Sequence, residues 1–211
     1  MASLYSDKRK ALESLISQLI PGFSIESKKE STLCRFYSKI LFFNKSFMTE
    51  YVTTLYPKIF VPELPWREDD DLEATVILAH EFVHLYDRKR MWLWFNLLYL
   101  SPQVLALFAV ATFWSPINIL WLVCLAPMPS LGRAWLEYRG YRATLASVYW
   151  LTGKKVELDW LLLQFSGPAY YWMFPFKNIL SKKFEKDFIR IENGDILGEE
   201  LELMKTVLDA S

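Results

Sequence analysis

The sequence contains few cysteines and has no net charge. Only Cys34 and Cys124 occur in 211 residues. This is too few for a disulfide framework, so we expect two small buried apolar residues in a reducing compartment. The 24 Lys and Arg residues balance the 24 Asp and Glu residues. Because no basic excess is available to neutralise phosphates, we expect no nucleic-acid partner.

Several common sequence signals are also missing. No apolar segment follows the basic residues near the N-terminus, so we expect no secretory signal and a protein that stays on the side where it is made. We find no Gly-rich phosphate loop, internal repeat or low-complexity segment. The length suits one substantial core, and we predict a single domain over residues 1–211.

Charge is missing altogether from residues 91–132. One bilayer crossing takes about 20 apolar residues, so this insert could supply two short crossings or a re-entrant hairpin. The 53% hydrophobic content and nine Trp residues favour membrane association. Basic residues on both sides of the insert place its ends on the cytoplasmic side. The alternatives are a hydrophobic hairpin buried in a soluble cytoplasmic protein, or an interface in an oligomer or larger assembly.

Both histidines of the chain lie in one H-E-x-x-H motif, at His80 and His84. On a helix, positions four apart share a face, so the two imidazoles can bind one metal ion. Zinc held in this way lowers the pKa of a bound water, and Glu81 is placed to take the proton as that water attacks a peptide carbonyl. The alternative is a pair of histidines hydrogen-bonded within a helical core.

A zinc site with two imidazoles needs at least one more protein ligand. Glu137 is the one carboxylate between Asp87 and Glu157, so we predict it as that ligand; the alternative is a salt bridge with nearby arginines. Gly140 would let its helix approach the motif helix closely. Asp87 lies three residues after His84 and is a candidate acceptor for the N–H of a ligand histidine. Its alternative is a solvated carboxylate paired with a neighbouring basic residue.

The pattern of the chain predicts an α+β fold that is mainly helical. We expect helices at about residues 7–20, 71–90 and 156–165, another around Glu137, and a terminal amphipathic helix at about 196–208. β-branched and aromatic residues predict a small antiparallel sheet with strands at 33–37, 39–43, 47–56 and 59–61. In a zinc peptidase, an edge strand of such a sheet could bind an extended substrate by strand addition.

Four further residues could stabilise the oxyanion that forms when a peptide carbonyl is attacked. Tyr141 and Arg142 follow Glu137 closely, and Tyr170 and Tyr171 lie in an aromatic stretch interrupted by Gly and Pro. Each carries a hydrogen-bond donor of the kind that such a site needs. The alternative for each is packing in the core or at a membrane interface.

The His80-Glu81-x-x-His84 motif followed by Glu137-x-x-Gly140 resembles the arrangement in gluzincin zinc metallopeptidases. The hydrophobic insert at 91–132 makes the chain similar to the membrane gluzincins of the CAAX-prenyl endopeptidase and bacterial heat-shock membrane peptidase type. The resemblance covers roughly residues 47–146 and is to a divergent or minimal member. It implies a zincin-like domain, with the two histidines and Glu137 as zinc ligands and Glu81 as general base.

The sequence therefore predicts a zinc-dependent endopeptidase that acts on a peptide or protein substrate through a zinc-activated water. The alternative is a structural or assembly protein, such as a virion or membrane-complex component, with a peptidase-like fold and a structural or vestigial metal. The two differ in an observable, because a catalytic metal keeps an open coordination position whereas a structural one is closed.

Overall fold

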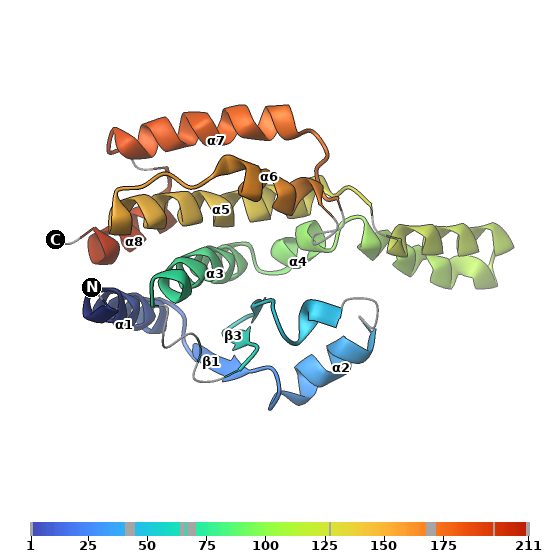
Figure 1. The fold of residues 1–211 in the computed structure, drawn as a ribbon. Helices are drawn as coiled ribbons and strands as arrows, with labels where there is room; N and C mark the ends of the chain where they lie inside the picture. Colours follow the sequence, from blue (N-terminus) through green and yellow to red (C-terminus); the bar gives the residue numbers. More distant parts are fainter. Residues whose placement is uncertain are drawn as a thin grey trace.

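A computed structural model describes residues 2–40, 45–63, 66, 71–126, 128–167, 172–195 and 197–209 (Figure 1). The elements are α1 (Ala2–Leu19), β1 (Ser24–Ser27), α2 (Thr32–Ile40), η1 (Lys45–Phe47), β2 (Thr53–Leu55), β3 (Lys58–Val61), α3 (Asp71–Met91), α4 (Leu93–Tyr99), η2 (Gln103–Phe113), η3 (Pro116–Leu125), α5 (Leu131–Thr152), α6 (Leu158–Ser166), α7 (Lys177–Glu192) and α8 (Glu199–Leu208). The prediction of a mainly helical α+β protein is confirmed.

Helices α3 and α5 pack against each other at the centre of the molecule (Figure 1). Helix α3 has apolar residues on nearly all sides, and its Leu78 and Phe82 are fully buried, as expected of a central helix. Acidic residues lie in its first turn and basic residues in its last, which suits the helix dipole. The predicted helix at 71–90 is therefore confirmed.

Local sequence sets both ends of α5. The Oγ of Ser130 caps the start by accepting a hydrogen bond from the backbone N–H of Arg133. Gly153 follows the last turn with a φ of 70°, a left-handed conformation that glycine adopts without steric cost. Between these ends, Gly140 and Ala143 are buried and small, so α5 can lie close to α3.

The sheet is mixed, so the prediction of an antiparallel sheet is wrong. Its strand order is β1-β3-β2, with β1 parallel to β3 and β2 antiparallel to β3. The predicted strand at 59–61 is confirmed, and β2 covers a short part of the one predicted at 47–56. Strand β1 was not predicted, because residues 24–27 are mostly polar. The chain between β1 and β3 returns across the sheet through α2, and this crossover permits parallel pairing.

Residues 32–40 form α2, so the strand predicted at 33–37 is also wrong. The signal that decides is a cap: Ser31 Oγ accepts a hydrogen bond from the backbone N–H of Cys34, which satisfies a donor in the first turn of a helix. Cys34 is buried while Phe36 is exposed, so aromatic composition alone was misleading here. The other predicted strand, at 39–43, falls mostly outside the described residues.

The uncharged insert forms α4 and then a pair of 3-10 helices, η2 and η3, which we call the hairpin (residues 103–125). The hairpin extends away from the rest of the molecule, and the insert connects α3 with α5, as predicted (Figure 1). Among the helices in the described residues, none combines the length and the apolar composition needed to cross a membrane alone. Helices α4 and η2 meet these criteria only as a pair, and the chain bends by 91° between them.

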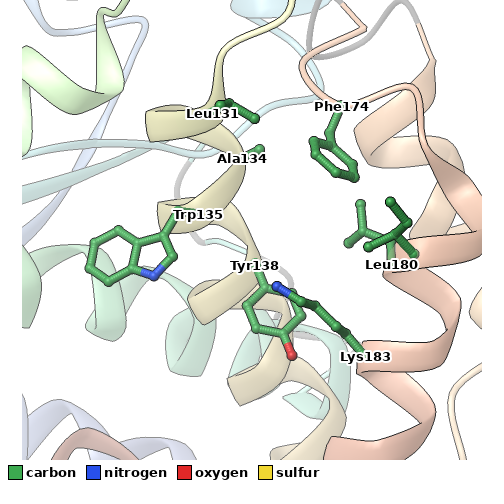
Figure 2. Close-up of a pocket in the computed structure, with 8 residues that line it drawn as sticks. Leu131, Ala134, Trp135, Tyr138, Phe174, Leu180 and Lys183 are labelled. Atoms are coloured by element: carbon green, nitrogen blue, oxygen red, sulfur yellow. The ribbon is translucent and has the colours of Figure 1, made fainter.

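Helices α6, α7 and α8 complete the core against α5 and α3. The prediction missed α7, although Leu180, Phe184 and Ile191 follow helical spacing within its charged sequence. A cavity of about 160 Å³ lies between α5 and α7 (Figure 2). Its lining is mostly apolar, with Tyr138 and Lys183 as polar members. Both cysteines are buried and unpaired, as expected.

Candidate metal centre

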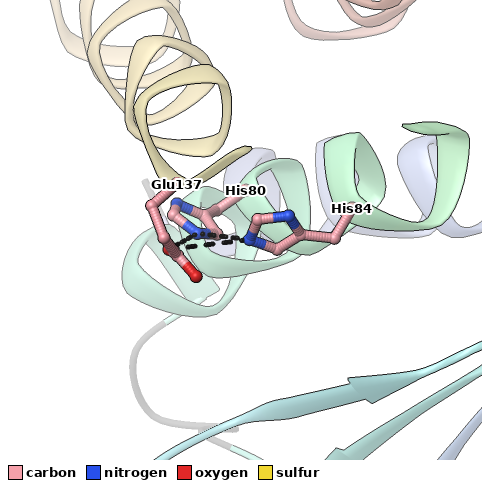
Figure 3. A group of neighbouring side chains, drawn as sticks. All are labelled: His80, His84 and Glu137. Carbon is pink, nitrogen blue, oxygen red and sulfur yellow. Dashed lines mark hydrogen bonds and ion pairs between the residues drawn. The ribbon is translucent and has the colours of Figure 1, made fainter. Parts of the chain in front are cut away.

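Helices α3 and α5 bring three donor atoms together (Figure 3). His80 Nε2 lies 3.1 Å from His84 Nε2, since the two rings project from successive turns of one helix face. Glu137 Oε2 lies 3.4 Å from His80 Nε2 and 3.7 Å from His84 Nε2. The exposed fractions of the three residues are 8%, 6% and 1% respectively. The predicted ligand residues therefore meet in one buried cluster.

These separations fit a zinc ion. Zinc bonds of about 2.0–2.2 Å in a tetrahedral arrangement hold ligand atoms about 3.3–3.6 Å apart. The observed separations of 3.1, 3.4 and 3.7 Å centre on that range. In addition, Glu137 Oε2 is buried, with the Nε2 atoms of His80 and His84 at 3.4 and 3.7 Å. A buried carboxylate needs a cationic partner, which a protonated histidine supplies in the metal-free state and a metal ion could supply in its place.

Comparison with known proteins assigns no role to these residues. No protein-family model matches the chain, and comparison with curated proteins and with solved structures finds no significant match. The roles of the surrounding residues are therefore inferred from their contacts.

Gly140 leaves room for the first histidine. A Cβ atom at this position would lie 2.7 Å from both Cε1 and Nε2 of His80, closer than atoms of this kind approach in proteins. The ring of His80 thus occupies the space that any other residue would fill. The predicted close approach of the two helices at Gly140 is confirmed, and it occurs at the metal cluster itself.

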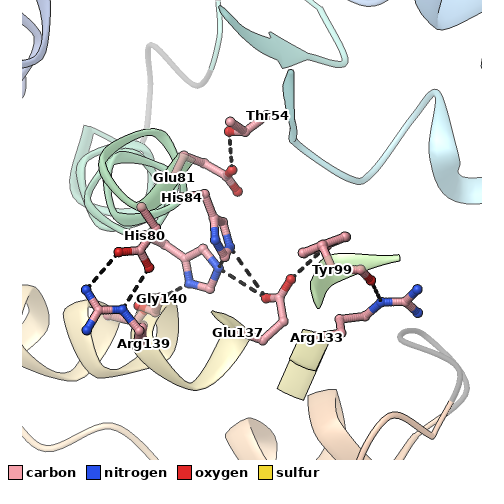
Figure 4. Close-up of polar contacts among 11 residues, drawn as sticks. Thr54, His80, Glu81, His84, Tyr99, Arg133, Glu137, Arg139 and Gly140 are labelled. Atoms are coloured by element: carbon pink, nitrogen blue, oxygen red, sulfur yellow. Dashed lines mark hydrogen bonds and ion pairs between the residues drawn. The ribbon is translucent and has the colours of Figure 1, made fainter. Parts of the chain in front are cut away.

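Two hydroxyl groups orient the ligands. Tyr99 of α4 donates a hydrogen bond of 2.8 Å to Glu137 Oε1, which leaves Oε2 directed at the histidines (Figure 4). Thr144 Oγ1 lies 3.3 Å from His80 Nδ1 and donates to the carbonyl oxygen of Gly140. Thr144 can then accept the proton of His80 Nδ1, and this tautomer leaves Nε2 with the lone pair that a metal requires.

Glu137 and His84 control each other's protonation. Burial lowers the pKa of His84, but the charge and hydrogen bond of Glu137, together with the charges of Glu81 and Asp87, raise this pKa to about 9. Burial raises the pKa of Glu137, but the charges and hydrogen bonds of His84 and His80 hold it well below its usual range. In the metal-free state His84 therefore carries a proton at neutral pH. A metal ion must displace that proton, so metal binding releases it.

Glu81 lies beside the cluster, on the side of the sheet. Its Oε2 accepts a hydrogen bond of 2.5 Å from the hydroxyl of Thr54 in β2 (Figure 4). Lys28 is fully buried nearby and donates to the carbonyl oxygen of Phe47. Burial lowers the pKa of Lys28 to about 8, although the charges of Cys34 and Glu81 act in the opposite direction. An edge strand of the sheet thus holds Glu81 by a hydrogen bond, and the carboxylate of Glu81 also interacts with the charge of the buried Lys28.

Asp87 does not have the predicted role of hydrogen-bonding a ligand histidine. Its two carboxylate oxygens accept hydrogen bonds of 2.7 and 2.8 Å from Arg139. Arg139 also contacts Glu200 of α8, which in turn pairs with Arg142. The predicted alternative, a pair with an adjacent basic residue, is wrong as well, because Asp87 is buried and faces α5. This network of two carboxylates and two guanidinium groups joins α3, α5 and α8.

The candidate oxyanion donors are placed differently from one another. Tyr141 packs against the ring of His80, with ring centroids 4.7 Å apart, and is therefore next to the cluster. The guanidinium of Arg142 is directed to Glu200, at 3.0 Å, and thus into the ionic network. Tyr170 and Tyr171 lie outside the described residues. Tyr141 is the one of the two described candidates that the structure brings to the histidines.

Sequence reasoning did not single out Thr54, Tyr99 or Thr144. A signal exists for Thr144, which lies seven residues after Glu137 and one turn after Gly140, on the same helix face. Thr54 falls within a predicted strand, but nothing local indicates that its hydroxyl meets Glu81. Tyr99 lies in the uncharged insert, where aromatic residues were interpreted as membrane contacts. Long-range packing decides both of these cases.

Proposed function

We propose that this protein is a zinc-dependent endopeptidase of the gluzincin type, with a zincin-like arrangement of motif helix and sheet. The observation that carries the proposal is the convergence of His80, His84 and Glu137 at separations suited to tetrahedral zinc. Three protein ligands leave a fourth position for a water molecule, as in catalytic zinc sites. The H-E-x-x-H spacing adds a carboxylate, Glu81, beside that position.

When bound, zinc would supply a Lewis acid that lowers the pKa of a coordinated water towards neutrality. The protein's own residues do the rest. Thr54 fixes Oε2 of Glu81, and the other carboxylate oxygen is our candidate for the atom that accepts the proton of the attacking water. Glu81 then returns this proton to the leaving amine. Tyr141, which packs against the first histidine, is our candidate donor to the developing oxyanion.

The sheet supports a peptide as the substrate. Strand β2 is an edge strand of the three-stranded sheet, and it carries Thr54, the residue bonded to Glu81. An extended peptide that pairs with this edge would lie beside the general base. Main-chain pairing is independent of side chains, so we infer that the enzyme cleaves extended, unfolded segments.

A Glu81→Gln variant tests the proposal. The wild-type protein is purified with its metal content measured, and cleavage of a fluorescent unfolded protein is followed. General-base catalysis contributes about 10²–10⁴-fold, so we expect a loss of activity of that size with metal content and fold retained. Glu73→Gln is the matched control, since it makes the same change in the exposed first turn of the same helix. Unchanged cleavage by a metal-loaded Glu81→Gln protein would refute the proposal.

The alternative is a structural or assembly protein whose metal stabilises the contact between α3 and α5. The burial of the cluster favours it, since Glu137 is only 1% exposed and Tyr99 covers one of its oxygens. Cobalt substitution separates the two functions. A catalytic site should bind a hydroxamate inhibitor and change its cobalt absorption spectrum, whereas a closed structural site should not respond.

A further inference from the structure

We propose that the hairpin (residues 103–125) inserts into one leaflet of a phospholipid bilayer. The inference concerns where the protein works and does not depend on the proposed peptidase activity. It rests on four features: the composition of the hairpin surface, the bonding of its polar groups, its length, and the exposed tryptophans in neighbouring segments.

The surface of the hairpin is apolar and unusually exposed. Phe113 and Trp114, at the tip, have exposed fractions of 91% and 83%. Most of the other apolar side chains along both helices are also exposed, and no residue of the hairpin is charged. The contact between Phe108 and Trp121, with ring centroids 5.5 Å apart, holds η2 against η3. A face of this kind extending from the body marks an interaction site with an apolar partner.

Two polar side chains of the hairpin, Thr112 and Asn118, bond to its own backbone. Thr112 Oγ1 donates to the carbonyl oxygen of Ala109 at 2.6 Å, and Asn118 Nδ2 donates to the carbonyl oxygen of Ala111 at 3.0 Å. The 3-10 helices satisfy most of their own backbone groups. Lipid offers no hydrogen bonds, so internal satisfaction is a requirement of a segment that enters it. A protein partner differs from lipid in that it could supply hydrogen bonds of its own.

The length of the hairpin suits insertion into one leaflet of a bilayer. Helix η2 has 11 residues. At about 2.0 Å per residue, this gives about 22 Å. The hydrocarbon core of a bilayer is about 30 Å thick, or about 15 Å per leaflet. The hairpin thus reaches through one leaflet but cannot cross both. Because η3 returns the chain to α5, the two ends remain on the same side.

Four exposed tryptophans lie in the segments that flank the hairpin in the sequence, or in a segment bonded to one of these. Trp92 and Trp94 lie at the start of α4, Trp135 in the second turn of α5, and Trp172 in the segment just before α7. That segment is tied to the start of α5 by the hydrogen bond between Ser130 N and the carbonyl oxygen of Met173. Tryptophan is enriched at the level of lipid headgroups. We therefore expect these side chains to contact the headgroup region when the hairpin is inserted.

Sedimentation with vesicles tests the insertion. We expect the full chain to bind phosphatidylcholine vesicles, with or without phosphatidylglycerol, and Phe113→Asp to reduce partitioning at least about ten-fold, since lipid strongly disfavours a carboxylate. Trp114→Asp is the second variant. Phe36→Asp is the matched control, because Phe36 is exposed on α2, far from the hairpin, and we expect no change (Figure 1). The exposed tip carries no core contacts, so these variants should fold normally.

Four results would overturn the proposal. The wild type could remain in the supernatant, or Phe113→Asp could bind like the wild type. Binding that requires phosphatidylglycerol and is unchanged by Phe113→Asp would indicate surface attachment through basic residues. Finally, light scattering could detect a dimer that Phe113→Asp abolishes while vesicles bind nothing, which would make a second copy the partner. Quenching of Trp114 fluorescence by brominated lipid, with Trp114→Phe subtracted, gives an independent measure of depth.

Discussion

The Gly140→Ala substitution tests the physical basis of the metal centre. Glycine in a helix interior is less favourable than alanine by about 1 kcal/mol, so propensity alone predicts a more stable protein. Here the added Cβ would lie 2.7 Å from two atoms of the His80 ring, and ordinary contact requires about 1 Å more. Overpacking of this kind costs about 1–3 kcal/mol. Because the overlap is about 1 Å, we take the upper part of that range, about 2–3 kcal/mol; less the propensity gain of about 1 kcal/mol, the free energy of unfolding should fall by about 1–2 kcal/mol.

The same clash predicts a loss of zinc affinity, because one of the two crowded atoms is His80 Nε2, the predicted ligand atom. A displacement that costs 1.4 kcal/mol of binding free energy lowers affinity about ten-fold. We expect at least this loss, measured by competition with a chromophoric chelator, together with a lower denaturation midpoint in urea. Both measurements use the whole 211-residue chain, and the urea denaturation is carried out with and without zinc.

Gly153→Ala is the control for Gly140→Ala. Gly153 has a φ of 70°, which strains any other residue, but nothing lies within 4 Å of an added Cβ. This variant should lose about 1 kcal/mol of stability through its backbone and keep the zinc affinity of the wild type. If Gly140→Ala proves as stable as the wild type, or binds zinc equally well, the close approach of α5 to His80 does not shape the site.

Three further predictions follow from the same contacts. Asp87→Asn should lower the free energy of unfolding by about 1–3 kcal/mol, measured in urea, without changing zinc affinity, because Asp87 pairs with Arg139 and not with a ligand. In the metal-free protein the pKa of His84 is about 9, above the unfolded value of 6.5. The stabilisation that this raised pKa provides is fully present below pH 6.5 and is lost as the pH rises through 9. Urea titrations at several pH values should show this loss, and the Glu137→Gln protein should lack this pH dependence. Tyr99→Phe should lower zinc affinity about ten-fold in the chelator competition, because Glu137 loses the hydrogen bond that orients it.

Local patterns predicted the parts of this fold that local interactions determine. The motif helix and the alignment of His80 with His84 follow from helical periodicity, which needs no knowledge of the rest of the chain. The proximity of Glu137 was predicted by elimination, because the insert and its flanks contain so few carboxylates. The close approach at Gly140 was predicted correctly, because a glycine destabilises a helix interior and is therefore expected where close packing leaves no room for a side chain.

Features that depend on distant segments were predicted poorly. Asp87 pairs with Arg139 because of how α3 and α5 are rotated against each other, and α8 supplies Glu200 to the same network. No pattern within one helix contains that information. In the same way, β1 pairs in parallel with β3 only because α2 intervenes, and α2 was mistaken for a strand. An error in one local element thus changed the predicted topology of the sheet.

The metal centre and the hairpin are joined by a short set of contacts. Tyr99 is the last residue of α4; its hydroxyl bonds to Glu137, and its carbonyl oxygen accepts a hydrogen bond of 3.1 Å from Arg133. The same guanidinium donates, also at 3.1 Å, to Gln103, the first residue of η2. The base of the hairpin and the carboxylate of the site are therefore bound to one arginine and one tyrosine. Because a displacement of the hairpin base must move Tyr99, we infer that the orientation of Glu137 depends on where the hairpin lies.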